Sequence, residues 1–151
     1  MVNIYFLFRM YGQKEYFSIM VVDTDSKYKS HFTEFYREDI LKYNPGYDFS
    51  HKKSQCVFFI LRDMVPAGLM ILEKNGDESH FVVLDYAIPK YRDFKIGYFL
   101  FQDNSRILKS KGIKNIYTSR GNDKHQRYLL KMGFIRSVYQ GKEVFGKQLI
   151  N

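Results

Sequence analysis

The sequence contains one cysteine, no tryptophan and no long apolar run. The shortage of cysteine and the shortage of apolar runs each exclude a class of protein. Cys56 lies alone within an apolar segment, which rules out a disulfide framework and a cysteine metal site and favours a reducing compartment, so we expect a cytoplasmic location. No run approaches the roughly 18 apolar residues of a membrane-spanning helix, so we expect no membrane span in this chain. The four histidines are scattered with no close pair, and the sequence predicts no metal site.

Two common motifs are also missing from the sequence: a glycine-rich nucleotide loop and a G-x-S-x-G nucleophile elbow. The 151 residues, 45% hydrophobic and 26% charged, suit a single globular domain with a core, much of it built from Phe and Tyr. A net charge of +8 indicates an anionic partner such as a nucleotide, a phosphorylated cofactor, nucleic acid or a membrane surface. Because the basic residues are spread along the chain, we expect no nucleic-acid binding.

The N-terminal residues 1–20 are unusually aromatic, with "IYFLFRMYGQKEYFSI" at 4–19. Two interpretations stay open for this segment. It forms an edge strand or a hairpin, or it is the stub of a larger protein that is attached to a membrane. Together with the C-terminal hairpin, it could also mediate a homodimer.

The remaining pattern predicts an α+β fold. One helix follows a cap at Asp25 or Ser26 and ends at Asn44-Pro45-Gly46. The other expected elements are strands at 55–63, 66–74, 79–88 and 113–119, helices at 94–111 and 122–132, an Asn75-Gly76 hairpin and a last hairpin around Gln140-Gly141. The first three strands should form an antiparallel meander, and strands 79–88 and 113–119 should be parallel because a helix connects them.

The stretch "AIPKYRDFKIGYFLF" at 87–101 leads from a buried strand through a basic loop into an apolar helix. A helix N-terminus carries unpaired N–H donors and a partial positive charge, and both favour a phosphate group. Gly97 would let a ligand approach the backbone, while Arg92 and Lys95 add positive charge. The alternative is an ordinary strand-to-helix turn with solvated basic residues.

Two motifs in this sequence resemble the Gcn5-related N-acetyltransferase (GNAT) superfamily. Residues 87–97 are similar to its motif A, matching at Arg92 and Gly97 and departing at Lys95, where the family usually has glycine. The second segment, "NDKHQRYLLKMGF", places Asn122 and Gly133 at the family's offsets. His125 replaces the usual Ala in this segment, Leu129 stands at the usual Tyr position, Tyr128 lies one residue earlier, and Lys131 and Phe134 also match. The resemblance covers roughly residues 54–149 and implies one domain over 1–151, with a mixed, mostly antiparallel sheet and helices on both faces.

The resemblance also implies an acyl-CoA ligand, usually acetyl-CoA as acyl donor. Its pyrophosphate would rest on backbone N–H groups of the loop, and its pantetheine arm would pair with the splayed end of strand 79–88. The cofactor-binding residues that follow are Tyr86, Ala87, Ile88, Arg92, Asp93, Phe94, Lys95, Ile96, Gly97, Tyr98 and Asn122. On this basis we expect charge reversal at Arg92, or bulk at Gly97, to abolish CoA binding and leave the fold intact.

Three residues are candidates for the chemistry of acetyl transfer. Asp85, the one carboxylate within the apolar strand 79–88, is a candidate general base, with a structural hydrogen-bond acceptor as the alternative. Tyr128 could protonate the leaving thiolate, with a core or surface tyrosine as the alternative. His125 could contact phosphate or transfer a proton, with a helix-surface histidine as the alternative. The sequence therefore predicts an acetyl-CoA-dependent N-acetyltransferase acting on a small-molecule or peptide amine by direct attack. The alternative is a non-catalytic CoA-binding or sensor module, attached to a membrane protein.

Overall fold

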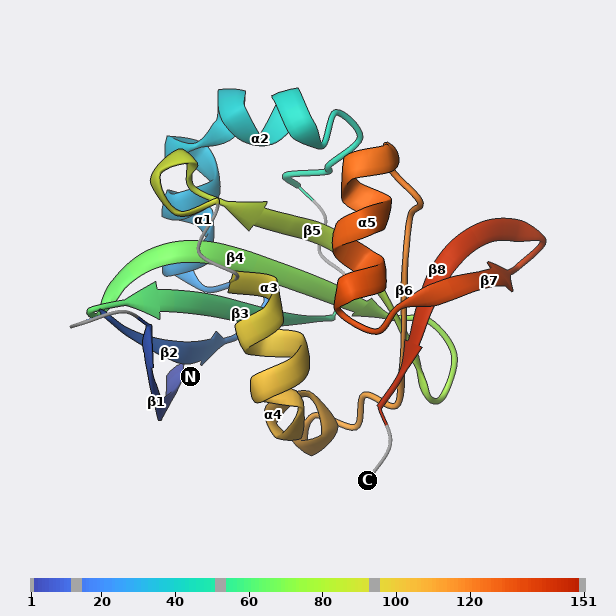
Figure 1. Cartoon of the computed structure of the whole chain (residues 1–151). Coiled ribbons are helices and arrows are strands. Elements are labelled where there is room, and N and C mark those ends of the chain that lie inside the picture. Colours follow the sequence, from blue (N-terminus) through green and yellow to red (C-terminus); the bar gives the residue numbers. More distant parts are fainter. Residues whose placement is uncertain (1, 12–14, 51–53, 93–95, 150–151) are drawn as a thin grey trace. The chain divides into compact units, whose positions relative to one another are not determined.

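The computed structural model describes residues 2–11, 15–50, 54–92 and 96–149, with side chains from residue 17 onward (Figure 1). The chain divides into two compact units. The first contains Met1–Glu73 and Val83–Ile96, and the second contains Lys74–Val82 and Gly97–Asn151. Each unit is described by itself below, and the single domain expected over 1–151 stays a prediction.

The first unit is built on a sheet whose strands follow one another in chain order. β1 (Val2–Tyr11), β2 (Glu15–Val22), β3 (Gln55–Arg62) and β4 (Val65–Lys74) pair antiparallel, and β5 (Ser79–Ala87) follows β4. Residues 2–11 and 15–22 therefore form an antiparallel pair of strands, in agreement with the first of the two interpretations of the aromatic N-terminal segment, and the interpretation as a stub of a larger protein stays open. Phe17, Phe58 and Phe59 are almost completely buried, so phenylalanine does build much of this core.

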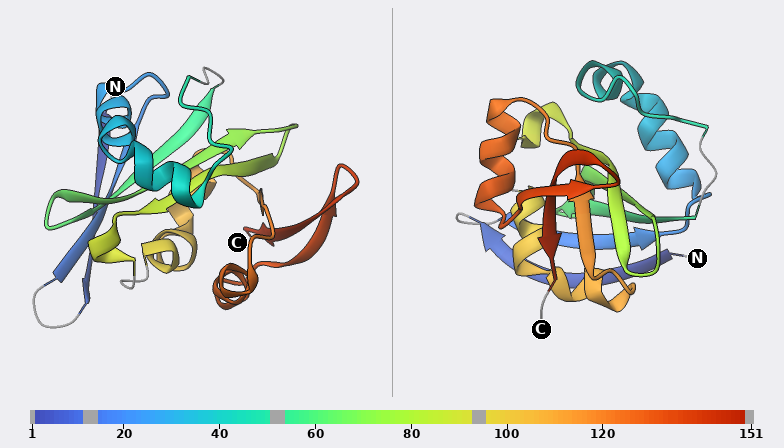
Figure 2. Two further views of the ribbon diagram at one scale, coloured as in Figure 1. Left: turned by 90° about the horizontal axis from the view of Figure 1, so that it is seen from above. Right: turned by 90° about the vertical axis from the view of Figure 1, so that its right-hand side faces the viewer.

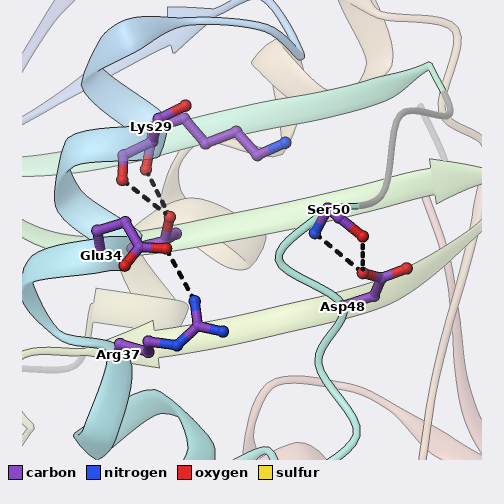
Figure 3. Close-up of polar contacts among 7 residues, drawn as sticks. Lys29, Glu34, Arg37, Asp48 and Ser50 are labelled. Atoms are coloured by element: carbon purple, nitrogen blue, oxygen red, sulfur yellow. Dashed lines mark hydrogen bonds and ion pairs between the residues drawn. The ribbon is translucent and has the colours of Figure 1, made fainter.

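The helix predicted after Ser26 is divided in two by Tyr36. Ser26 does cap α1 (Lys27–Phe35), with its side chain accepting a hydrogen bond from the Tyr28 N–H at 3.1 Å. Tyr36 then leaves the helical conformation (φ −100°, ψ 18°), and α2 (Arg37–Tyr43) follows directly. An exposed ion pair of 2.8 Å joins Arg37 to Glu34 across this break (Figure 3). The Tyr36 ring contacts Phe32 at 4.8 Å between ring centroids, which turns it toward the core while the backbone changes direction.

The second unit contains the first residues of β5, Ser79–Val82, followed in the sheet by β6, β8 and β7. β6 (Asn115–Thr118) is parallel to β5, as the connecting helix predicted, and antiparallel to β8 (Lys142–Gln148). β8 forms a hairpin with β7 (Ile135–Tyr139), shown in red in Figure 2, around the expected turn at Gln140-Gly141. The β5–β6 pairing ends at Phe81 and Tyr117, although β5 continues to Ala87.

The helix predicted at 94–111 is irregular where the structure describes it. α3 (Ile96–Tyr98) leads into a π-helical turn at Phe99–Asp103, and α4 (Ser105–Ser110) follows. Asn104 explains the interruption, because its side-chain nitrogen donates a 2.8 Å hydrogen bond to the Phe99 carbonyl and its backbone is not helical (φ −125°). No helix within these described ranges is long and apolar enough to cross a membrane.

The last helix, α5 (Asp123–Lys131), agrees with the prediction. Asn122 caps it, and its side-chain oxygen accepts a hydrogen bond from the His125 N–H at 2.9 Å. Gly133 follows with a φ of +87°, the left-handed conformation expected after a helix end. Leu129 is 1% exposed, so the position where the resemblance expected a tyrosine belongs to the core of this unit.

Candidate functional site

The candidate site begins in the first unit, where β5 turns away from the sheet. The Ile88 N–H donates to the Ala67 carbonyl at 3.0 Å, and Ile88 has the extended backbone that a following proline favours. Pro89–Tyr91 forms a single 3₁₀ turn, closed by a 2.9 Å bond from the Tyr91 N–H to the Ile88 carbonyl. We call residues 87–91 the corner. Its ordered hydrogen bonds fix the direction in which the chain leaves the sheet.

Arg92 follows the corner, and all three kinds of its guanidinium nitrogen have partners inside the first unit. Nε donates to the Ala87 carbonyl at 3.2 Å, and one terminal nitrogen donates to the Tyr43 hydroxyl at 3.4 Å. The other terminal nitrogen forms an ion pair with Asp39 on α2. The guanidinium carbon also lies 4.4 Å from the centre of the Tyr43 ring and 5.7 Å from that of Tyr86.

Asp39 connects this arginine to the end of β5. The Tyr86 hydroxyl donates a 2.5 Å hydrogen bond to the same Asp39 oxygen that binds Arg92. We refer to Asp39, Tyr43, Tyr86 and Arg92, together with the Ala87 carbonyl, as the Asp39 cluster. It joins α2 to the end of β5 and to Arg92, since Tyr86 and Arg92 lie 47 and 53 residues from Asp39 in the sequence.

The electrostatics of the Asp39 cluster favour an ionised carboxylate. Partial burial would raise the pKa of Asp39, but the hydrogen bonds from Tyr86 and Arg92 and the positive charges of Arg92 and Lys42 outweigh it, so the pKa lies below its usual value. Burial and the hydrogen bond to Asp39 raise the pKa of Tyr86. Tyr86 therefore keeps its proton near neutral pH and donates a hydrogen bond to the charged carboxylate of Asp39.

In the second unit, Gly97 lies in the first turn of α3 against Tyr128 from α5. A Cβ atom placed on Gly97 would lie 1.7 Å from the Tyr128 hydroxyl oxygen and 3.0 Å from the Met132 sulfur. No side chain can occupy that position while Tyr128 keeps its place. The glycine that the motif assigned to ligand approach is thus already required by packing within the chain.

His125 and Tyr128 lie together on α5. Their rings are 5.6 Å apart between centroids and tilted by 32°. His125 also packs on Gly121, where an added Cβ would be 2.6 Å from the imidazole ring. The structure therefore groups Asn122, His125 and Tyr128 at the start of α5 and places Tyr128 at Gly97, all within the second unit.

The other predicted residues have less distinctive surroundings. Asp85 is half-buried on β5 in the first unit, and its role as general base stays a prediction. Ile88 and Ile96 are buried, and Tyr98 is 38% exposed. Asp93, Phe94 and Lys95 lie outside the described residues, so their assignment to the cofactor stays a prediction. No group of three or more metal-binding side chains occurs in the part of the chain that the structure describes.

Sequence reasoning did not identify Asp39 or Tyr43. Both lie on α2, one turn apart, so their spacing places them on one face of the helix. That spacing was a signal, but it is common on surface helices. Their partner Arg92 is 53 residues from Asp39 and 49 from Tyr43, and no local pattern predicts such contacts.

Comparison with known proteins gives a consistent result for the fold. No protein-family model matches the sequence, and no curated protein matches it. Solved structures do match. A GNAT-family acetyltransferase from Staphylococcus aureus Mu50 has 15% identity and a TM-score of 0.59 over 87% of this chain and 99% of its own. A GNAT-family acetyltransferase from Elizabethkingia anophelis, solved with acetyl-CoA bound, has 16% identity and a TM-score of 0.52 over 87% and 98%.

A third match is an acetyltransferase from Bacillus subtilis in complex with CoA. It has 17% identity and a TM-score of 0.53 over 85% of this chain and 87% of its own. The chain has the GNAT acetyltransferase fold. At these identities the similarity concerns the fold and does not identify an acceptor, so the activity has to be argued from this chain's own residues.

Proposed function

We propose that this GNAT-fold protein is an acetyl-CoA-dependent N-acetyltransferase that acts on a small-molecule or peptide amine. The observation that carries the proposal is the fold similarity over 85–87% of the chain, because the matching structures include one with acetyl-CoA and one with CoA. The net charge of +8 supports an anionic ligand. We keep the cytoplasmic location and the homodimer as predictions alongside it.

The residues that are present are compatible with an acyl-CoA donor. Pairing with β6 ends at Phe81, so β5 continues toward Ala87 beyond it, the feature expected where a pantetheine arm pairs with a strand. The loop from the corner to α3 would supply backbone N–H groups to the pyrophosphate. Gly97 fits this role only in part, because the Tyr128 hydroxyl already occupies the space that the missing side chain leaves.

In the proposed reaction the unprotonated amine attacks the thioester carbonyl carbon directly. The new C–N bond forms, the C–S bond breaks, the amine loses a proton and the departing thiolate gains one. We assign the proton acceptor to Asp85, directly or through water. Tyr128 is our candidate for protonating the thiolate, and its neighbour His125 for supplying that proton or contacting a phosphate.

A second candidate function is a non-catalytic CoA-binding or sensor module. Two observations favour it. Leu129 is buried at the position where the resemblance expected a tyrosine, and Arg92 is engaged by Asp39 and the Ala87 carbonyl. Such a module would bind the donor and release no thiol in the presence of amines.

The test begins with isothermal titration of the full chain with acetyl-CoA and with CoA, followed by measurement of thiol release with a panel of amines. Tyr128→Phe, which removes the hydroxyl and keeps the ring, should lower turnover and change donor affinity little. Tyr139→Phe on β7 is the matched control and should behave like the parent, because its hydroxyl bonds only the Asn75 carbonyl among the described contacts. No donor binding up to millimolar concentration would overturn the proposal, and binding without turnover would favour the module.

A further inference from the structure

The Asp39 cluster has more contacts than an isolated surface ion pair. The side chains of Arg92 and Asp39 are 32% and 26% exposed, and a simple pair at such exposure would contribute little to stability. Here the guanidinium also bonds the Ala87 carbonyl and the Tyr43 hydroxyl and stacks on two rings. A planar group with donors in a fixed fork is well suited to hold several segments in one arrangement.

The cluster encloses the corner. The Arg92 side chain, from the residue after the corner, bonds the carbonyl of Ala87, the corner's first residue, and the corner's own hydrogen bonds lie between these two positions. Asp39 and Tyr43 fix the cluster from α2, and Tyr86 fixes it from β5. The cluster therefore sets how residues 87–92 leave the sheet.

These contacts oppose a direct role for Arg92 in binding phosphate. A guanidinium that binds a pyrophosphate directs several donors at the ligand, whereas here Nε and one N–H of each terminal nitrogen are already bound within the first unit, which leaves two of the five N–H groups. The two roles predict opposite effects of Asp39. If Asp39 only competes with phosphate for Arg92, removing its charge should tighten donor binding. If Asp39 holds the corner through Arg92, the same change should weaken donor binding.

We propose that Asp39 is a positioning residue for the acyl donor: through the guanidinium of Arg92 it holds the corner at residues 87–91 and the end of β5 in the arrangement that binds the donor, while Arg92 itself does not bind phosphate. This inference rests on the proposed function, since it concerns the same donor site. It assigns a role to a residue of α2 that lies outside both sequence motifs.

The first experiment measures acetyl-CoA affinity by titration at low and at high salt for the parent, Asp39→Asn, Arg92→Gln and the control Glu38→Gln. Glu38 is the exposed neighbour of Asp39 on α2, so the control removes the same charge one residue away. Asp39→Asn and Arg92→Gln should each weaken binding by about tenfold, and the double variant by no more than either one. The dependence of affinity on salt should stay that of the parent, because no phosphate contact is lost.

Tighter or unchanged binding in Asp39→Asn would overturn the proposal. So would a weaker salt dependence in Arg92→Gln, since this would show that the arginine contacts the phosphates. The KM values for the two substrates distinguish a positioning role from a general structural defect. A positioning role should raise KM for acetyl-CoA and leave KM for the amine near that of the parent, whereas a structural defect should change both.

A second measurement, made without donor, separates failure of this inference from failure of the proposed function. Hydrogen exchange of the Ile88 and Tyr91 amides should accelerate in Asp39→Asn and not in Glu38→Gln, because the cluster stabilises the hydrogen bonds that protect them. No acceleration would overturn the holding role whether or not the donor binds. Acceleration together with a parent that binds no acetyl-CoA would instead overturn the proposed function and, with it, the donor role of Asp39.

Discussion

The contact between Gly97 and Tyr128 gives a prediction with a definite sign. In Gly97→Ala the new methyl group would meet the Tyr128 hydroxyl at 1.7 Å, far inside any acceptable separation, so Tyr128 or α3 has to move. Overpacking of this kind costs about 1–3 kcal/mol. Alanine also has a better helix propensity than glycine, by up to about 1 kcal/mol, which offsets part of that cost. In the parent background we therefore expect a net loss of about 0–3 kcal/mol in the free energy of unfolding.

The same substitution should behave differently when Tyr128 is truncated. In a Tyr128→Ala background the hydroxyl and ring are gone, and the next contact is the Met132 sulfur at 3.0 Å, at the end of a flexible side chain. The propensity gain is then nearly unopposed, and Gly97→Ala should be neutral or stabilising by up to about 1 kcal/mol. Because the propensity term is common to both backgrounds, it cancels in the double-mutant cycle, and a coupling of about 1–3 kcal/mol remains.

Equilibrium unfolding in urea of the four proteins measures this coupling, provided that the slopes with denaturant agree. Equal effects of Gly97→Ala in the two backgrounds, within about 0.5 kcal/mol, would refute the reasoning. They would mean that Tyr128 does not fill the space at Gly97, and that the glycine is free to serve a ligand alone.

Two further predictions concern the second unit. His80 is 3% exposed, and its Nδ1 has no hydrogen-bond partner among the described atoms. Burial and the charge of Lys74 lower the pKa of His80 from its usual value of 6.5, so the unfolded chain binds the proton more readily than the folded one. The free energy of unfolding should therefore fall as the pH drops below about 6.5. His80→Leu should flatten this loss between about pH 7.5 and pH 5.5 in urea unfolding, and an equal loss in both proteins would contradict the assignment. Asn122→Ala should lower the free energy of unfolding by about 1 kcal/mol, because α5 loses the cap that accepts a hydrogen bond from the His125 N–H. Asn122→Asp keeps an acceptor oxygen and should retain most of that free energy. Equal losses in the two variants would show that the cap contributes nothing.

The elements with strong local chemistry were predictable from sequence. The cap at Ser26 and the turn at Gln140-Gly141, with φ of +51° and +77°, lie where the patterns placed them. Each of these signals depends on one residue and its near neighbours, so it survives without knowledge of the fold. The parallel pairing of β5 and β6 followed from the helix between them.

Two helix interruptions were missed for a physical reason. Apolar periodicity continued through Tyr36 and Asn104, and periodicity reports which face is buried without reporting whether the backbone stays helical. At Asn104 the side chain takes the Phe99 carbonyl, and at Tyr36 the ring packs on Phe32. Asparagine within a helix was the one available signal, and it was outweighed by the surrounding leucines and isoleucines.

The motif residues illustrate a more general difficulty in assigning this site. Arg92 and Gly97 match the motif, yet each is also required inside the chain, Arg92 by Asp39 and the Ala87 carbonyl, and Gly97 by Tyr128. Charge reversal at Arg92 would place a carboxylate beside that of Asp39, and bulk at Gly97 would displace Tyr128. From the sequence we expected both changes to abolish CoA binding and leave the fold intact. Because both disturb contacts within the chain, neither tests ligand binding alone. Where one residue has both a packing role and a ligand role, removing it changes both, so its substitution cannot distinguish them. Asp39→Asn and Tyr128→Phe are sharper probes, because each keeps the shape of the side chain and removes one defined charge or hydroxyl.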